Sequence, residues 1–135
     1  MTKNNTSSAN AEETLELQNK KFRKELNAGT SALILLSLLR KAGKPLYGYE
    51  ISKLLEKNAS DKQGAIYPVL RNMVSKGLLE VDVKPSDSGP PRKYFSISPL
   101  GRTVLQEWIK IWAETKNIVD FSISETPIKS DQGND

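Results

Sequence analysis

The 135-residue sequence contains neither cysteine nor histidine. The lack of cysteine excludes a disulfide framework. Together the two absences remove the usual protein ligands of zinc and haem, and they remove the Ser-His and Cys-His pairs of nucleophilic enzymes. A phosphate-binding glycine loop and carboxylates paired at a useful catalytic spacing are also missing. We therefore expect no enzymatic activity and no cofactor.

Long apolar runs are absent as well. The longest, Ala32 to Leu39, is interrupted by a serine and is far shorter than a membrane-spanning helix. The N-terminus has no apolar stretch of the kind found in secretory signals. These features predict a cytoplasmic protein without a membrane partner.

Both ends of the chain are poor in apolar residues. Residues 1–11 and 124–135 are mostly small polar or charged, so they bury too little apolar surface to offset the entropy of ordering, and we predict two disordered tails. Positive charge is concentrated between them. Residues 31–110 contain thirteen Lys and Arg against seven Asp and Glu, a net charge of +6, whereas the whole chain has +4. This distribution suits a polyanionic partner, although a solvated lysine-rich surface would have the same composition.

The region that follows the first tail predicts two helices. Residues 12–30 form a helical arm, with a helix over Glu12–Asn27 whose apolar residues are too sparse for a core helix. We expect this arm to pack on something else, such as a partner subunit. Thr30 or Ser31 is predicted to cap a second helix, which ends at Ala42 and is apolar on most faces.

Residues 31–98 have the element order of a winged helix-turn-helix. A short helix from Tyr47 to about Lys57 is followed by a polar turn and by a helix from Lys62 or Gln63 to Lys76. In the latter, apolar residues recur at i, i+3, i+4 and i+7 and predict one buried stripe: Ile66, Val69, Leu70 and Met73.

Two alternating runs, Leu79–Val83 and Tyr94–Ser98, then predict a β-hairpin. The segment between them, from Lys84 to Arg92, is long and rich in turn residues. We expect a projecting tip that is not a tight two-residue turn.

Residues 99–123 predict one long helix that begins at Ser98 or Pro99. Its apolar residues cover more than one narrow stripe, which is more than a terminal helix on a small module needs for itself. Two-fold dimerisation is the simplest explanation. The expected fold is therefore mainly α with a small β-hairpin, a winged helix-turn-helix plus a long C-terminal dimerisation helix.

Four motifs occur in order along this region: Pro45-Leu-Tyr-Gly-Tyr-Glu-Ile51, Gly64-Ala-Ile-Tyr-Pro-Val-Leu-Arg71, Gly77-Leu-Leu79 and Gly89-Pro-Pro-Arg-Lys-Tyr94. Together they resemble the PadR family of bacterial transcriptional regulators over roughly residues 31–112. The resemblance implies a dimeric winged helix-turn-helix protein that binds DNA, usually as a repressor. The single long C-terminal helix resembles the short-tailed PadR subgroup, whose members include repressors that sense hydrophobic or aromatic compounds.

Candidate DNA contacts lie on the outward face of the 62–76 helix and beside the hairpin tip. Arg71 has the donors to bind guanine or a phosphate, or it faces solvent. Tyr67 either donates to a phosphate or packs on the wing, and Tyr47 is either structural or faces DNA. The remaining candidates are Gln63, Asn72 and Ser75 on the helix, and Lys84, Arg92 and Lys93 around the tip.

Trp108 and Trp112 are one helical turn apart on the C-terminal helix. Aromatic residues at this spacing commonly form an interface core. In a dimer they could also leave a slot in which a flat aromatic ligand stacks. The resemblance favours Trp112 for that role, because some multidrug-responsive PadR-like regulators use a tryptophan of this helix.

The sequence thus predicts a dimeric, sequence-specific repressor bound to an inverted-repeat operator in double-stranded DNA. Relief of repression by an aromatic or lipophilic small molecule is a further expectation. The alternative is a winged-helix module that binds proteins and does not recognise DNA sequence. The outward Arg71 and the basic wing favour the repressor, because an adaptor needs neither.

Overall fold

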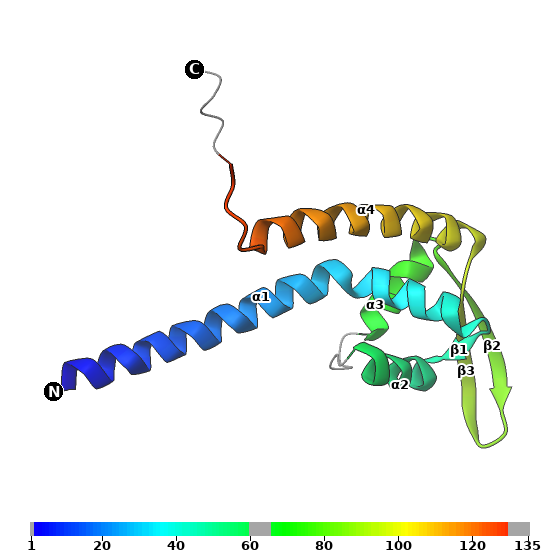
Figure 1. Ribbon diagram of the computed structural model, residues 1–135. Coiled ribbons are helices and arrows are strands. Elements are labelled where there is room, and N and C mark those ends of the chain that lie inside the picture. The colour runs from blue at the N-terminus through cyan, green and yellow to red at the C-terminus, as the bar shows by residue number, and fades with distance from the viewer. Residues whose placement is uncertain (1, 60–65, 130–135) are drawn as a thin grey trace.

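The computed structural model describes residues 2–59 and 66–129, and their side chains over 7–57 and 66–129. Within these ranges the fold is mainly helical with a small antiparallel sheet, as predicted. The elements, in chain order, are α1 (Thr2–Ala42), β1 (Leu46–Tyr47), α2 (Gly48–Ala59), α3 (Ile66–Ser75), β2 (Leu79–Ser86), β3 (Gly89–Ile97) and α4 (Pro99–Ile123) (Figure 1).

Helix α1 runs without a break, which differs from the expected disordered tail over residues 1–11 and from the expected new helix at Thr30 or Ser31. The two hydroxyls do not cap a helix. The side chain of Thr30 donates to the carbonyl of Leu26 at 2.9 Å, and that of Ser31 donates to the carbonyl of Asn27, both one turn back in the same helix. The single Gly29 costs only about 1 kcal/mol relative to alanine, so it does not end the helix.

The sheet has three strands in the order β1-β3-β2. Strand β1 is missing from the sequence-based prediction, because a strand of two residues has no periodicity to detect. It pairs Leu46 with Phe95 and Tyr47 with Tyr94. Tyr47 therefore lies in the sheet, immediately before α2, instead of beginning a helix.

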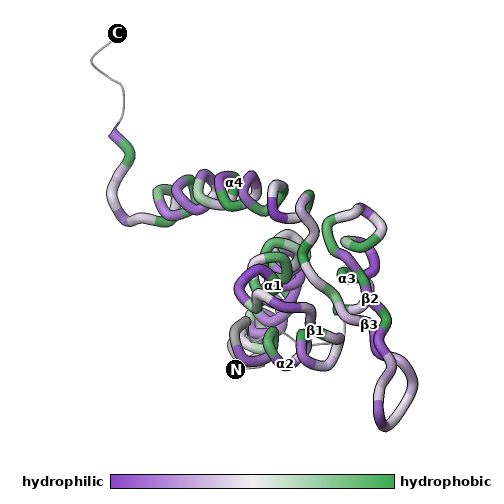
Figure 2. Tube along the Cα trace, turned by 90° about the vertical axis from the view of Figure 1, so that its right-hand side faces the viewer, coloured by the Kyte–Doolittle hydropathy of each residue, from purple (hydrophilic) through white to green (hydrophobic). Residues whose placement is uncertain are grey.

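Strands β2 and β3 are longer than predicted. They pair from Leu79–Ile97 out to Ser86–Gly89, so the turn is Asp87-Ser88, and the prediction that excluded a tight two-residue turn is wrong. The register shifts between Lys84 and Ser86, where Pro90 and Pro91 together oppose Pro85. A bulge of this kind accommodates prolines, which lack an amide hydrogen for the ladder. The hairpin still projects from the module, and its tip is hydrophilic (Figures 1 and 2).

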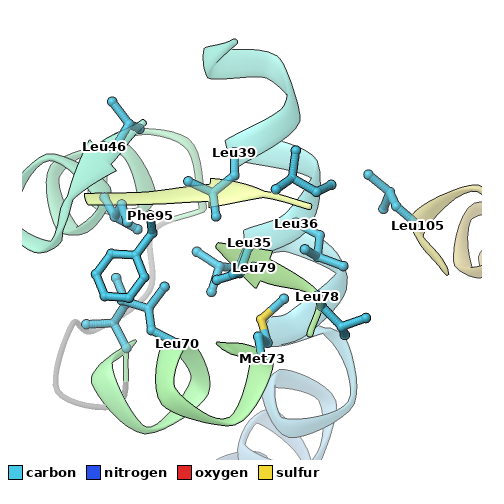
Figure 3. Packing of buried hydrophobic residues seen from close by; sticks show 13 residues of the cluster. Leu35, Leu36, Leu39, Leu46, Leu70, Met73, Leu78, Leu79, Phe95 and Leu105 are labelled. Atoms are coloured by element: carbon cyan, nitrogen blue, oxygen red, sulfur yellow. The ribbon is translucent and has the colours of Figure 1, made fainter. Parts of the chain in front are cut away.

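The hydrophobic core lies where α1, α3 and the sheet meet (Figure 3). Its fully buried side chains come from every helix: Leu35, Leu36, Ile51, Leu70 and Leu105. Complete burial of such a side chain contributes about 1.5–3 kcal/mol. The predicted stripe of α3 faces this core, with Ile66, Leu70 and Met73 buried and Val69 half-buried. The core therefore fixes α3 with its opposite face turned to solvent.

Helix α3 ends in a glycine-terminated cap. Gly77 has a φ of 76°, and the amide of Leu78 donates to the carbonyl of Met73 at 2.9 Å. This is the hydrogen bond of a Schellman motif, in which glycine avoids the steric penalty of the left-handed conformation.

Helix α4 begins and ends as predicted, and its start is joined to the end of α3. The Ser98 hydroxyl accepts from the amide of Gly101 at 2.9 Å and donates to the carbonyl of Gly77 at 2.6 Å. A Cβ at Gly101 would collide with the carbonyl oxygen of Leu78. We call these four residues, Gly77, Leu78, Ser98 and Gly101, the α3–α4 junction.

Beyond α4, residues 124–129 form neither helix nor strand. The remainder of the predicted C-terminal tail, residues 130–135, lies outside the described residues. Among the helices that the structure describes, none has the length and apolar content needed to cross a membrane.

Candidate nucleic-acid interface and the groove between α1 and α4

The outward face of α3 displays four of the five side chains predicted there. Tyr67, Arg71, Asn72 and Ser75 are all exposed, on the side opposite the buried stripe. The Ser75 hydroxyl donates to the backbone carbonyl of Asn72 at 2.8 Å. The fifth, Gln63, lies outside the described residues. A phenol, a guanidinium and an amide on one helix face can contact both base edges and phosphates.

Tyr67 contacts the start of α2. Its side chain lies against Gly48, the first residue of α2, and a Cβ at Gly48 would stand 2.9 Å from two of its ring carbons. The residue is still 50% exposed. One side of the ring therefore sets the approach of α2 to α3, while the rest is accessible.

Three tyrosines, Tyr47, Tyr49 and Tyr94, form what we call the tyrosine cluster at the base of the wing. The rings of Tyr47 and Tyr49 are stacked, with centroids 6.3 Å apart and planes 18° apart. Tyr47 and Tyr94 meet edge to face, with centroids 5.6 Å apart and planes at 66°. These are favourable arrangements of aromatic rings. The cluster joins β1, β3 and the start of α2.

A cation lies over each ring of the cluster. The Arg92 guanidinium carbon is 4.5 Å from the centroid of Tyr47, the Lys84 Nζ is 5.1 Å from that of Tyr94, and the Lys53 Nζ is 5.5 Å from that of Tyr49. These distances are within the range of cation–π attraction. Lys84 and Arg92 are also cross-strand partners. The structure thus brings together two of the three predicted wing cations and Tyr47.

Lys93 is separated from the other two wing cations. It pairs with Val83, and successive side chains of a strand point to opposite faces, so Lys93 lies on the opposite face of the hairpin from Arg92 and Lys84. Acidic Asp82 shares the face of Arg92, because it is the partner of Tyr94. Sequence reasoning missed the roles of Tyr94, Tyr49 and Lys53, since only the pairing of β1 with β3 brings these residues near Tyr47.

A groove of about 580 Å³ lies between α1 and α4, and both predicted tryptophans line it. Trp108 is half-buried against the core, and Trp112 is 42% exposed. The lining from α1 was not predicted, because the packing of α1 on α4 leaves no local signal. The lining residues are Glu25, Leu26, Gly29, Thr30, Ala32 and Leu33 of α1, and Trp108, Ile111, Trp112 and Thr115 of α4.

The groove continues into an apolar line of residues on each of its two helices. On α1, Leu15, Phe22, Leu26 and Leu33 follow one another at spacings of seven, four and seven residues, which keeps them on one side of the helix. We call this line the α1 seam. Trp108, Trp112, Thr115 and Val119, at spacings of four, three and four, form the α4 seam. Figure 2 shows hydrophobic residues recurring along the whole of α4.

Comparisons with known proteins agree on one family. Residues 35–107 match the model of the transcriptional regulator PadR-like family. A protein of Lysinibacillus sphaericus, described as "Uncharacterized protein X", is 34% identical over 82 residues, which cover 58% of this chain and 75% of that protein.

Solved structures of regulators are similar over most of the chain. A PadR family transcriptional regulator from Eggerthella lenta is 28% identical, with 84% of this chain and 98% of that one covered and a TM-score of 0.72. A PadR-like transcriptional regulator from Bacillus cereus is 29% identical, with coverage of 76% and 99% and a TM-score of 0.63.

The family match extends from the last two turns of α1, through α3 and the wing, into the first half of α4. It therefore includes the outward face of α3, the tyrosine cluster and the α3–α4 junction. With its winged-helix fold and with this match over more than half of its length, the chain belongs to the PadR-like family of transcriptional regulators.

Proposed function

We propose that this protein is a homodimeric repressor that acts in the cytoplasm and binds an inverted-repeat operator in double-stranded DNA. The observation that supports this most directly is the exposed polar face of α3. In helix-turn-helix proteins the corresponding helix enters the major groove. There the Arg71 guanidinium suits guanine or a phosphate, and the Asn72 amide suits adenine. Tyr67 and Ser75 have hydroxyls for nearby phosphates.

The wing supplies the second part of the proposed interface. Lys84 and Arg92 share one face of a projecting hairpin and Lys93 lies on the other, so each face of the wing offers a cation to the DNA backbone beside the groove that α3 occupies. Each phosphate neutralised by a Lys or Arg releases counterions, and the slope of log K against log salt changes by about 0.9 per contact. Binding should therefore weaken steeply as salt is raised.

The α1 and α4 seams support dimerisation. Phe22 of the α1 seam is 65% exposed and Val119 of the α4 seam is 47% exposed, although both are apolar. Exposed apolar surface of this extent is typical of an interface. In the proposed dimer, α4 (99–123) is the main dimerisation helix, residues 12–30 of α1 are an arm on the partner, and residues 31–98 are the DNA-binding part. The two α3 helices then lie about one DNA turn, roughly 34–36 Å, apart.

The groove supports a ligand that relieves repression. Its volume falls within the range of about 300–1,000 Å³ found for small-molecule sites. Trp108 and Trp112 offer ring faces for a flat aromatic or lipophilic compound. For such a compound to release DNA, it must prefer a dimer in which the two α3 helices have the wrong spacing for the operator.

The test of DNA recognition is a fluorescence anisotropy titration of the protein with duplex DNA from its own promoter region. A scrambled duplex of equal composition serves as competitor, and two salt concentrations are compared. We expect tight, selective and salt-sensitive binding, and a loss of about 1–3 kcal/mol for Arg71→Ala. The matched control is Lys110→Ala, an exposed cation of α4 that lies 3.8 Å from Glu107.

Equal and weak binding of the natural sequence and the scrambled duplex would reject the proposal. A winged-helix module that binds another protein would then be the better description.

A further inference from the structure

The ring of Tyr47 is fixed in place by its surroundings. Its backbone pairs with Tyr94 across β1 and β3, and its amide donates to the Glu50 carboxylate of α2 at 3.1 Å. That bond is one half of a capping box, in which the third residue of a helix reaches back to the residue before the helix. Tyr49 stacks on the ring from one side, and Tyr94 meets it edge to face. Strand, helix and neighbouring rings therefore share in orienting one side chain.

Arg92 uses this fixed ring as a support. Its guanidinium carbon lies 4.5 Å from the ring centroid. A planar guanidinium that stacks through its face keeps its N–H groups directed outward at its edges. Those edges are the part that binds a phosphate. An arginine held over a fixed ring is ordered before DNA arrives, which reduces the side-chain entropy lost on binding.

A competing partner for Arg92 lies close by. Asp82 is on the same face of the hairpin, two residue pairs away from the Lys84–Arg92 pair. Diagonal neighbours in an antiparallel pair are within reach of long side chains. Without the ring, the guanidinium is free to turn towards this carboxylate, and its charge is then less available to a phosphate.

We infer that Tyr47 is a positioning residue of the DNA interface, which acts on DNA by holding Arg92 and not through its own hydroxyl. The inference rests on the proposed function, because it assigns to Tyr47 a role in presenting a wing cation to the DNA backbone. The sequence left two roles open for Tyr47, a structural one and a direct contact with DNA. The inference replaces the direct contact with an indirect role through Arg92.

The test compares the DNA affinity and the salt dependence of the full-length protein with those of four variants: Tyr47→Phe, Tyr47→Leu, Arg92→Ala and the Tyr47→Leu/Arg92→Ala double variant. We expect Tyr47→Phe to bind as the natural protein does, because the ring face is retained. Tyr47→Leu should weaken binding about two- to fivefold, the loss expected from an exposed cation–π pair. In the Arg92→Ala background the same leucine should have no further effect.

Two results would overturn the inference. If Tyr47→Phe lost as much affinity as Tyr47→Leu, the hydroxyl itself would be the DNA contact. If Tyr47→Leu weakened binding equally with and without Arg92, the tyrosine would act independently of the arginine. Tyr47→Phe alone distinguishes the hydroxyl from the ring, so a loss of affinity in this variant overturns the inference even if the leucine variant unfolds.

The matched control is Tyr49→Leu, the same change one ring further from Arg92. We expect it to weaken binding less than Tyr47→Leu does, because the pairing with Tyr94 and the Glu50 bond still hold Tyr47 in its absence. An equal loss would also overturn the inference, since the effect would then belong to the whole cluster. Failure of the proposed function would be seen in the natural protein itself, which would then bind promoter DNA no better than the scrambled duplex. Failure of the inference would be seen only in the variants.

Discussion

Tyr67 of α3 lies so close to Gly48 of α2 that a Cβ added at Gly48 would overlap the tyrosine side chain. The two residues belong to the two helices of the helix-turn-helix, so their contact sets how closely α2 approaches α3. The contact between this glycine and this half-exposed ring thus sets the distance between α2 and α3 at the candidate interface.

Substitution Gly48→Ala should destabilise the protein by up to about 1 kcal/mol, the low end of the cost of overpacking, because the half-exposed Tyr67 ring can shift to make room. The added Cβ must displace either the ring of Tyr67 or the start of α2. The free energy of unfolding, measured by urea denaturation, provides the check. In the Tyr67→Ala background the alanine at position 48 should cost markedly less, because its obstacle has been removed.

Gly29→Ala is the matched control for Gly48→Ala. Apart from its own stretch of helix backbone, nothing lies within 4 Å of the position of its Cβ, and it is in the interior of α1. Alanine there should stabilise the protein by about 0.5–1 kcal/mol, because it lowers the entropy cost of forming the helix. Equal effects at positions 29 and 48 would contradict the role assigned to the Gly48–Tyr67 contact.

Substitution Ser98→Ala should cost about 2 kcal/mol. The hydroxyl is the N-cap of α4, worth about 1 kcal/mol, and its loss also leaves the Gly77 carbonyl without this donor. Denaturant unfolding again supplies the measurement. Ser122→Ala removes another α4 hydroxyl, which donates only to the carbonyl of Ile118 in its own helix and is exposed, and should change stability by less than about 0.5 kcal/mol.

Substitution Phe22→Asp should weaken the proposed dimer, because it places a charge in the α1 seam. Sedimentation velocity over a range of protein concentrations would measure the shift towards monomer. Leu17→Asp is the control, since Leu17 is on the other side of α1 and is 63% exposed, much as Phe22 is at 65%. A monomeric natural protein, or equal effects of the two changes, would exclude the α1 seam as part of an interface.

Binding of a ligand in the groove should quench the intrinsic tryptophan fluorescence. Trp108 and Trp112 are the two tryptophans of the sequence, and both line the groove, so the signal reports on this site alone. A planar aromatic dye is a suitable probe. Trp112→Leu should weaken its binding about tenfold through loss of stacking. Phe121→Leu removes an α4 ring that is not in the lining, and an equal loss there would rule out stacking on Trp112.

Local sequence signals predicted the elements whose ends are fixed by nearby residues. The bounds of α4 follow from Ser98 and Pro99 at one end and a continuous amphipathic pattern to Ile123. The stripe of α3 follows from helical periodicity, which also identified Arg71 as outward-facing. In α1, however, the Gly29-Thr30-Ser31 run has the composition of a helix end followed by a cap. The structure uses the same hydroxyls for bonds within one helix, and composition does not distinguish the two outcomes.

Features that depend on pairing between distant residues could not be predicted. Strand β1 exists only because Leu46 and Tyr47 meet β3, and the tyrosine cluster follows from that pairing. The length of the hairpin was underestimated, because three prolines near its tip argued against strands that a bulge makes possible. The groove is lined by residues of the first and last helices, which are far apart in the sequence, so no local pattern predicts it.

The α3–α4 junction is a rigid connection between the end of α3 and the start of α4. One hydroxyl serves both helix ends, and the backbone of Leu78 approaches Gly101 too closely for even a methyl group to fit. Because this connection is tight, the two helix ends should move together and not independently of each other. A shift at the start of α4 would therefore be passed directly to the end of α3, the helix that displays Tyr67, Arg71 and Ser75 on its exposed face.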